Sequence, residues 1–365
     1  MPEPTAGGVV RTRRASTLAQ VYRRFSEVEA AGTSPLYERV ALALSESEEA
    51  LRAIEAAPAR KRQPKVILAA LHDLALAGRA PALAAAYAAG DGEAAAAAAI
   101  DALLRMTGSV VAIAARRLPN ANETGHCAVL YPAIAEAARR VGASAVGLID
   151  VCCSAALNLN VDRVGIVYGN GQSLGDRSSP VQLSSAIVGG RPLPARPVPE
   201  VVARVGIDLD PVDVTDAEDA RWLRACLWPD QREQMARLEA EIGLAAALPP
   251  LLLQGDAVEV LSDAIARVPE YALPVVITTW ALSRLPLESR LRFLHRLDEA
   301  AAGRAVAWVS LEGVGVAPAI PTLGDRRASG HSILGLAVFD SSALHAEAVG
   351  RCWSQGRWLE WLADS

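Results

Sequence analysis

The sequence lacks several features that mark specialised classes of protein. Its five cysteines form no Cys-x-x-Cys pair, lysine and arginine form no block, and no apolar run reaches the roughly 18–20 residues of a membrane span. No apolar core follows Arg11, Arg13 and Arg14, so a secretory signal is not expected. These absences argue against structural zinc, a disulfide framework and a membrane protein, and they favour a reducing cytoplasm.

The composition is that of a soluble, globular protein. The chain of 365 residues has a net charge of −5 and is 52% hydrophobic. An acidic balance argues against nucleic acid as the main partner, because phosphate backbones are bound by excess lysine and arginine. The length predicts one large or two modest domains.

The hydrophobic pattern changes near residue 141 and divides the chain. Residues 1–15 are polar and predicted to be disordered. Residues 16–141 have helical periodicity almost throughout, with apolar positions of 17–31 on one face and an alanine-rich stretch at 80–105, and are expected to form an α-helical cap domain. Residues 142–365 alternate strand-like and helix-like segments, with a Gly- and Pro-rich insertion at about 162–203 that suits irregular structure or a hairpin.

Short apolar segments in the second part are typical of strands. They are 146–150, 203–209, 251–254, 274–280, 305–311 and 332–339, with 357–361 as a candidate seventh. Helix-like segments separate most of them, and the last ones follow each other closely. The sequence therefore predicts an α/β fold, with a Rossmann-like, doubly wound sheet that has an antiparallel C-terminal end.

The stretch 146–159 predicts where a ligand binds. An apolar run ends at Asp150, small residues follow at 152–156, and a helix-like register begins after them. In a doubly wound sheet the ligand lies beyond the first strand, over the N-terminus of the next helix. A nucleotide-binding loop normally contains glycine, whereas none occurs between Asp150 and Leu157. The pattern thus supports the fold more strongly than a nucleotide cofactor.

Polar residues stand at the ends of the other predicted strands. They are Asp208 with Asp210, Asp256, Thr278 to Trp280, and Glu312. Some of these are expected to be helix caps or turn formers, and others to face a shared crevice.

Two further groups have alternative interpretations. Asn122, Glu123 and His126 lie at the predicted domain junction, where they either cap a helix or form the substrate-facing rim of the cleft. The adjacent Cys152 and Cys153 are either buried small residues or a reactive pair, although no histidine is near them in sequence.

In this order, the strand-end residues resemble the class I S-adenosylmethionine-dependent methyltransferases. The resemblance implies that residues 150–156, including Cys152, Cys153, Ser154 and Ala155, correspond to the first cofactor motif, with Asn158 just beyond it. It assigns Asp208 to the ribose hydroxyls and Asp256 to the adenine edge. Thr279 and Trp280 would contact the cofactor or the substrate.

Residues from about Phe25 to Trp361 resemble, more closely, a bacterial family of unknown function, numbered 2332. The matching pieces are Ser34–Tyr37, Asn122–Glu123, Ser154–Ala155, Leu157–Asn158, Asp162–Arg163, Arg204–Leu209, Pro211–Asp216, Ala220–Leu223, Trp228–Pro229, Gly255–Ala257 and Gly356–Trp361. The family loop resembles Glu-Val-Gly-Ala-Ser-Ala-Gly, and this chain has Asp-Val-Cys-Cys-Ser-Ala-Ala at 150–156. Both glycines are replaced, which indicates a diverged member.

Three functions are compatible with these observations. The first is an enzyme of specialised-metabolite biosynthesis that keeps the methyltransferase crevice without a cofactor. It would catalyse cyclisation or elimination of a sulfate- or phosphate-type group from an amino-acid-like substrate. Asp150 or Asp208 would be the base, Glu123 and His126 would assist, and the helix N-terminus at 153–156 would hold the anion. The second is a working S-adenosylmethionine-dependent methyltransferase. The third is a non-catalytic scaffold with a protein partner or a second copy of the chain.

Overall fold

The computed structural model describes residues 17–119, 124–340, 343–353 and 356–364, which form two compact units. Among these residues, one unit comprises 17–119 together with 221–232, and the other comprises those of 124–220 and 233–364. The N-terminal segment predicted to be disordered lies outside the described residues, as does Glu123.

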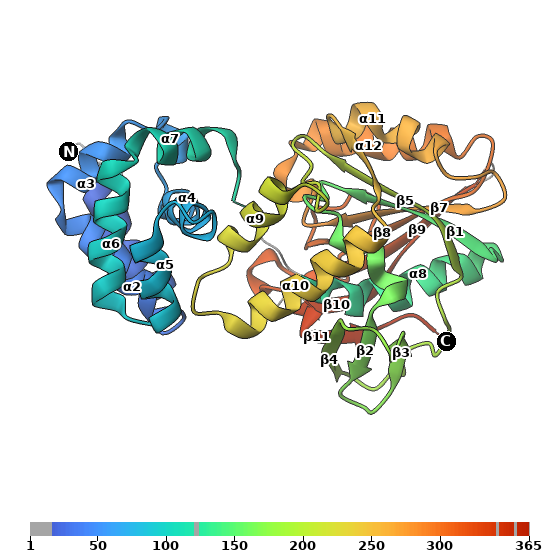
Figure 1. The fold of residues 1–365 in the computed structure, drawn as a ribbon. Coiled ribbons are helices and arrows are strands. Elements are labelled where there is room, and N and C mark those ends of the chain that lie inside the picture. The colour runs from blue at the N-terminus through green and yellow to red at the C-terminus, as the bar shows by residue number, and fades with distance from the viewer. Residues whose placement is uncertain (1–16, 120–123, 341–342, 354–355, 365) are drawn as a thin grey trace, which may run out of the picture. The chain divides into compact units, whose positions relative to one another are not determined.

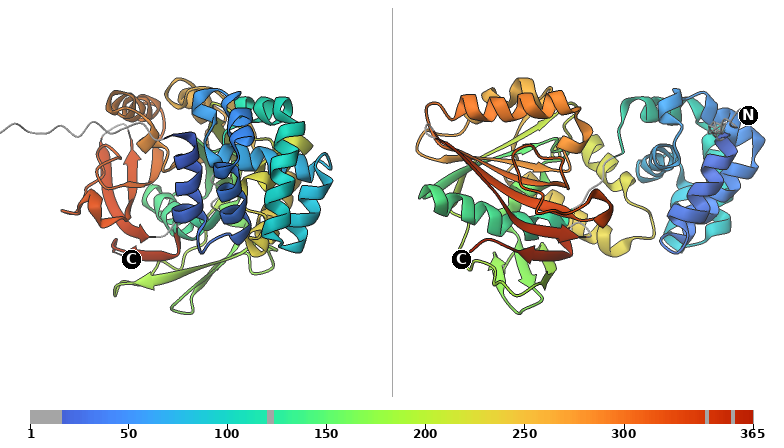
Figure 2. Two further views of the ribbon diagram at one scale, coloured as in Figure 1. Left: turned by 90° about the vertical axis from the view of Figure 1, so that its left-hand side faces the viewer. Right: turned by 180° about the vertical axis from the view of Figure 1, so that it is seen from behind.

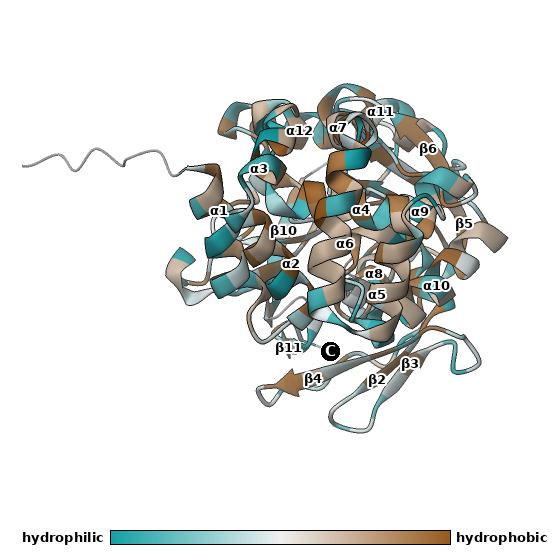
Figure 3. Cartoon of the chain, turned by 60° about the vertical axis from the view of Figure 1, so that its left-hand side comes forward, coloured by the Kyte–Doolittle hydropathy of each residue, from teal (hydrophilic) through white to brown (hydrophobic). Residues whose placement is uncertain are grey.

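The first unit is built from helices in the part of 17–119 that the structure describes. They are α1 (Leu18–Arg24), a π-helical turn (Phe25–Ala30), α2 (Pro35–Glu46), α3 (Glu48–Glu55), a 3₁₀ turn (Ala59–Lys61), α4 (Pro64–Leu76), α5 (Pro81–Ala89), α6 (Gly92–Arg105) and α7 (Thr107–Arg116). Side chains of Thr17, Ser34, Ser47 and Asp91 cap four of them by accepting backbone N–H bonds. Alanines give α5 and α6 their apolar colour in Figure 3.

Residues 221–232 are held in this helical unit by polar contacts. Arg221 pairs with Asp73 at 2.9 Å, and the indole N–H of Trp222 donates to the Leu118 carbonyl. Ser34 Oγ donates to Asp230 at 2.8 Å. Helix α9 (Ala217–Cys226) therefore begins in one unit and ends in the other, a grouping that no local sequence pattern indicated.

Within the described residues, the second unit contains an eleven-stranded, mostly parallel sheet in the order β3-β2-β4-β11-β10-β9-β8-β7-β1-β5-β6. The strands are β1 (Ala145–Val151), β2 (Gly165–Tyr168), β3 (Ser173–Gly175), β4 (Gln182–Val188), β5 (Glu200–Asp208), β6 (Leu251–Gln254), β7 (Leu273–Thr279), β8 (Val306–Gly313), β9 (Ser332–Phe339), β10 (Leu344–Trp353) and β11 (Trp358–Trp361). Strands β6, β5, β1, β7 and β8 are parallel neighbours. The predicted mixed α/β fold is confirmed at this level.

Helices cover both faces of the parallel region (Figure 1). On one side lie α8 (Cys127–Val141) and α10 (Arg232–Ala247), and on the other lie α11 (Ala257–Ala266) and α12 (Leu287–Ala300). Leu148 and Ile277 point toward α8, whereas Ile149 and Trp308 point toward α11 and α12. Both faces are therefore apolar, which explains the nearly continuous apolar runs in these strands. The sequence grouped α8 with the preceding helices, but its packing is against this sheet.

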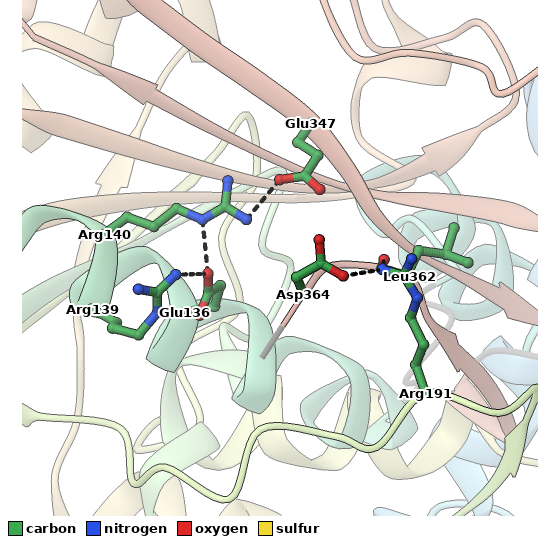
Figure 4. A network of polar contacts seen from close by, with 7 residues as sticks. All are labelled: Glu136, Arg139, Arg140, Arg191, Glu347, Leu362 and Asp364. Carbon is green, nitrogen blue, oxygen red and sulfur yellow. Dashed lines mark hydrogen bonds and ion pairs between the residues drawn. The ribbon is translucent and has the colours of Figure 1, made fainter.

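The C-terminal strands extend the sheet in antiparallel fashion, as the red strands in Figure 2 show. Strand β10 was missed by sequence reasoning because its alanines and glycine give weak strand propensity. The 162–203 insertion contains a β2–β3 hairpin, as one alternative predicted, and its strand β4 also pairs with β11. An ion-pair network links α8 to this part of the sheet (Figure 4). Arg140 of α8 pairs with Glu136 of the same helix and with Glu347 of β10.

The predicted helix directly after β1 is wrong. The chain instead forms a turn and a seven-residue 3₁₀ segment, η4 (Leu157–Arg163), before β2 begins at Gly165. This segment is too short for an amphipathic helix, and Ala156 precedes it in a left-handed conformation. The predicted anion site at a helix N-terminus over 153–156 is therefore corrected.

Within the described residues, no single helix has the length and apolarity needed to cross a membrane. Two sharply bent helix pairs, α4 with α5 and α6 with α7, meet those criteria only when each pair is taken together.

Candidate functional site

Strands β1, β5, β6, β7 and β8 end at one edge of the sheet, called here the carboxyl edge. Strand β1 lies between β5 and β7, so the chain builds outward from β1 first in one direction and then in the other. Ligands of open α/β sheets bind at such a switch point, outside the strand ends. The residues that follow β1 and β7 are therefore the first place to look for a site.

Backbone strain concentrates at this switch point. Residues 152–156, called here the β1 turn, contain three non-glycine residues with positive φ: Cys152 at 55°, Ser154 at 51° and Ala156 at 53°. Trp280, directly after β7, has φ of 55°. Each such conformation costs roughly 1–2 kcal/mol for a residue with a Cβ. The described chain has only two other such residues, Ala319 and Leu323, so the strain is not spread evenly.

The β1 turn is closed onto the end of β5. Asp208 accepts hydrogen bonds from the backbone N–H of Ser154 at 2.9 Å and of Asp210 at 3.0 Å, one on each carboxylate oxygen. The Cys153 N–H donates to the Ile207 carbonyl. The carboxylate that the methyltransferase resemblance assigned to a ribose thus binds backbone of its own chain.

Side chains of the β1 turn also cover Gly206 on β5. A Cβ at position 206 would lie 2.8 Å from Cys153 Sγ and 3.1 Å from a Cβ of Ala156. Only glycine permits this approach, since such distances are below ordinary contact. Gly206 was not singled out from the sequence, although a glycine inside a strand is a signal of close approach.

Three predicted residues meet beneath the edge. Asn158 Nδ2 lies 3.4 Å from Asp150 Oδ2 and 3.4 Å from Thr279 Oγ1. Asp150 is fully buried, and its Oδ1 has no hydrogen-bond partner in the described structure. Burial, with a smaller contribution from the charge of Asp208, raises the pKa of Asp150 to about 7 against the opposing effect of the Asn158 hydrogen bond. A group that titrates near neutrality can give and take protons at physiological pH.

A second buried carboxyl stands at the end of β8. Glu312 Oε1 accepts the backbone N–H groups of Ala281 and Leu282, both at 2.9 Å. Burial raises the pKa of Glu312 to about 7, against the opposing effect of these hydrogen bonds. The strand register places Glu312 on the α12 side of the sheet and Asp150 on the α8 side.

Cys152, in the β1 turn, packs against the apolar cluster on the α11 and α12 side of the sheet. Burial raises the pKa of its thiol to about 11, and the charges that act on it come from Asp208, Arg284, Asp150 and Glu312. Arg284, in the turn after β7, is the one cation among them. It is exposed and forms no ion pair with another described residue. Nothing in its local sequence singled it out.

The other residues predicted from the sequence, Asp256, Ala155 and His126, take no part in the hydrogen bonds around Asp150 in the described structure. Asp256 caps α11 by accepting the Val258 N–H at 2.9 Å. Ala155 is buried. His126 is buried at the start of α8, and burial lowers its pKa to about 4. The thiol of neighbouring Cys127 lies 3.9 Å from the Asn158 carbonyl, which places this segment next to η4.

The cysteines have the surroundings of structural residues. All five are free, and burial raises the pKa of Cys153 well above its usual value. Such thiols carry little thiolate at neutral pH. Among the described residues, no group of three or more histidine, cysteine or acidic side chains is arranged to hold a metal ion.

A comparison with family models matches residues 19–361 to DUF2332, described as an uncharacterized protein conserved in bacteria. No curated protein and no solved structure matches the chain.

Proposed function

The chain belongs to the DUF2332 family, and we propose that it is a diverged methyltransferase-like enzyme that acts on a small molecule without S-adenosylmethionine. One observation carries the proposal: four strained residues surround the end of β1, directly beside the buried Asp150. Strain of this kind persists only where the surrounding structure imposes it, and it is concentrated at functional sites.

The strand order supports the methyltransferase-like part. In chain order the parallel strands are β1, β5, β6, β7 and β8, and they lie in the sheet as β6-β5-β1-β7-β8. This is the 3-2-1-4-5 order of doubly wound folds that bind nucleotides at the switch point. The meander β8-β9-β10 follows it.

The β1 turn does not fit the cofactor. A nucleoside at this position needs backbone free of side chains and an acid free for its ribose hydroxyls. Here Cys153 and Ala156 cover Gly206, and Asp208 already holds the N–H groups of Ser154 and Asp210. The proposed reaction therefore takes place without S-adenosylmethionine.

Asp150 is the proposed general base. In a ring closure it takes the proton of the substrate amine, which bonds to a carbon while the carbon–oxygen bond to a sulfate or phosphate group breaks. The electron pair of that bond departs with the anion. In an elimination the proton comes from carbon, and its electron pair forms the double bond. Neither reaction needs a co-reactant, and a base with a pKa of about 7 suits both.

Arg284 is the proposed partner of the departing anion. It takes the role that the sequence gave to a helix N-terminus, because that helix does not exist. The acidic groups around Cys152 favour a substrate that also carries an amine. His126 and Glu123 remain candidate rim residues.

The test compares small-molecule products. A bacterial strain lacking the gene is complemented with the wild type, with Asp150→Asn, or with Asp298→Asn on the exposed face of α12 as a matched control. Untargeted mass spectrometry should show a product that the wild type and Asp298→Asn restore and Asp150→Asn does not. If a folded Asp150→Asn protein restores the same profile, the enzymatic role is wrong and a scaffold is favoured.

A methyltransferase that uses S-adenosylmethionine is the second candidate, favoured by the strand order alone. It requires the β1 turn to open, since Cys153 and Ala156 cover the backbone on which the nucleoside would lie.

A further inference from the structure

Glu312 joins two strand ends through the turn that follows β7. Its Oε1 accepts the N–H groups of Ala281 and Leu282, each at 2.9 Å. The preceding residue, Trp280, donates its N–H to the Leu311 carbonyl at 3.0 Å, and its own carbonyl accepts from Ser283 Oγ at 2.9 Å. Four hydrogen bonds thus define the course of residues 280–283, and the Arg284 N–H donates to the Ala281 carbonyl at 3.1 Å.

We propose that Glu312 is a positioning residue that holds Trp280 and Arg284 at the carboxyl edge and thereby sets the affinity of Arg284 for the anionic group of the substrate. This inference rests on the proposed function, because it assigns the anion to Arg284.

The geometry around Trp280 explains why such a residue is needed. Trp280 is 42% exposed and has a positive φ, so neither burial of its ring nor its backbone preference holds it in place. The Leu311 carbonyl fixes one side of it, and Glu312 fixes the next two N–H groups. Adjacent residues of β8 thereby impose the strained conformation from both sides.

The second carboxylate oxygen of Glu312 points to a role beyond capping. Oε2 is buried and has no hydrogen-bond partner in the described structure, and the same holds for the Ser310 hydroxyl on the same face. A glutamine would supply the same accepting oxygen without a charge. A carboxyl kept there costs stability when it ionises, which is expected of a group whose charge is used.

The charge gives the anion affinity a pH dependence. The ionisable groups that interact with Glu312 are Arg290 on α12 and Cys152 in the β1 turn, and Arg284, in the turn that Glu312 holds, acts on the same thiol. An ionised Glu312 repels an anion at Arg284, whereas a protonated one does not. Sulfate affinity is therefore expected to fall as pH rises through about 7, the pKa of Glu312.

The experiment uses the full-length protein and inorganic sulfate, which does not titrate in this range. Sulfate binding is measured calorimetrically from pH 5.5 to 8.5 at constant ionic strength. Glu312→Ala should raise the dissociation constant at pH 6 about fivefold or more, since two hydrogen bonds that hold the turn are lost. Glu312→Gln should remain within about twofold at pH 6 and show a weaker pH dependence. Asp150→Asn serves as a control, because Asp150 also titrates near 7.

A second readout does not depend on the anion. Acrylamide quenching of Trp280 is obtained as the difference between each protein and its Trp280→Phe version. Glu312→Ala should increase this quenching, and Glu312→Gln should leave it unchanged. If neither readout changes in a folded Glu312→Ala protein, the positioning role is wrong. If the wild type binds no sulfate, or Arg284→Ala binds it equally well, while quenching responds as expected, the anion role of Arg284 is wrong and Glu312 still positions the turn.

Discussion

The backbone N–H of Ser154 donates a 2.9 Å hydrogen bond to Oδ2 of Asp208. This bond ties the turn after the first parallel strand to the end of the second. It joins the two segments that the methyltransferase resemblance assigns to a bound nucleoside. Its acceptor, Asp208, is the residue that this resemblance assigns to the ribose hydroxyls. The closed β1 turn is the basis for proposing a reaction without S-adenosylmethionine.

We predict that Asp208→Ala lowers the free energy of unfolding by about 2–3 kcal/mol, because two N–H groups lose a charged acceptor. Urea unfolding at pH 7 measures it. Asp298→Asn, on an exposed helix face, should change stability by less than about 0.5 kcal/mol. Equal stability of Asp208→Ala and the wild type would show that the turn is not held this way.

Ser154→Gly is expected to stabilise the protein by roughly 1 kcal/mol. It relieves a left-handed φ of 51° and removes a buried hydroxyl that has no partner in the described structure. Ala155→Gly is the matched control, because Ala155 does not have a positive φ, and it should destabilise by about 0.5–1 kcal/mol. Thermal unfolding of both variants gives the comparison, and a loss of stability in Ser154→Gly would contradict the strain.

The closed turn was only partly predictable. The parallel strands, the switch point and the positions of Asp150, Asp208 and Thr279 followed from apolar runs that end in polar residues. Because the segment 151–156 has no glycine, residues with a Cβ occupy the left-handed conformations of this turn. The absence of an α-helix after β1 could not be predicted, because the alternation of apolar and polar residues from Leu157 to Val161 is compatible with an α-helix and with a 3₁₀ segment. Arg284 and the pairing of 221–232 with the helical unit depend on contacts between distant segments, which no local pattern encodes.

Stability is predicted to depend on pH through Asp150. Its pKa is about 7 in the folded protein, whereas an aspartic acid in the unfolded chain has a pKa of 3.8. The folded protein therefore binds this proton more tightly than the unfolded chain does. The associated stability is fully present below about pH 4 and is lost as pH rises through 7, with an upper bound of about 4 kcal/mol. Glu312 acts in the same direction.

Urea unfolding across pH 4–8 tests this dependence. Asp150→Asn should have a flatter profile than the wild type and should gain on it most above pH 7, where the wild type buries a charge. Parallel profiles for the two proteins would mean that Asp150 titrates normally.

Thiol labelling tests the structural interpretation of the cysteines. Since the pKa of Cys152 is raised to about 11, its thiolate fraction at pH 8 is on the order of 10⁻³. Iodoacetamide should therefore modify native Cys152 at least about tenfold more slowly than the unfolded chain. Peptide mapping identifies the modified residue. Preferential labelling of Cys152 in the folded protein would instead indicate a reactive thiol.

The account depends most on the closed turn excluding S-adenosylmethionine. Isothermal titration of the full-length protein with S-adenosylmethionine, and with its demethylated product, measures this directly. We expect no binding heat at ligand concentrations up to about 1 mM, which corresponds to a binding free energy weaker than about −4 kcal/mol. A dissociation constant in the micromolar range for either ligand would contradict the account and identify a working methyltransferase site.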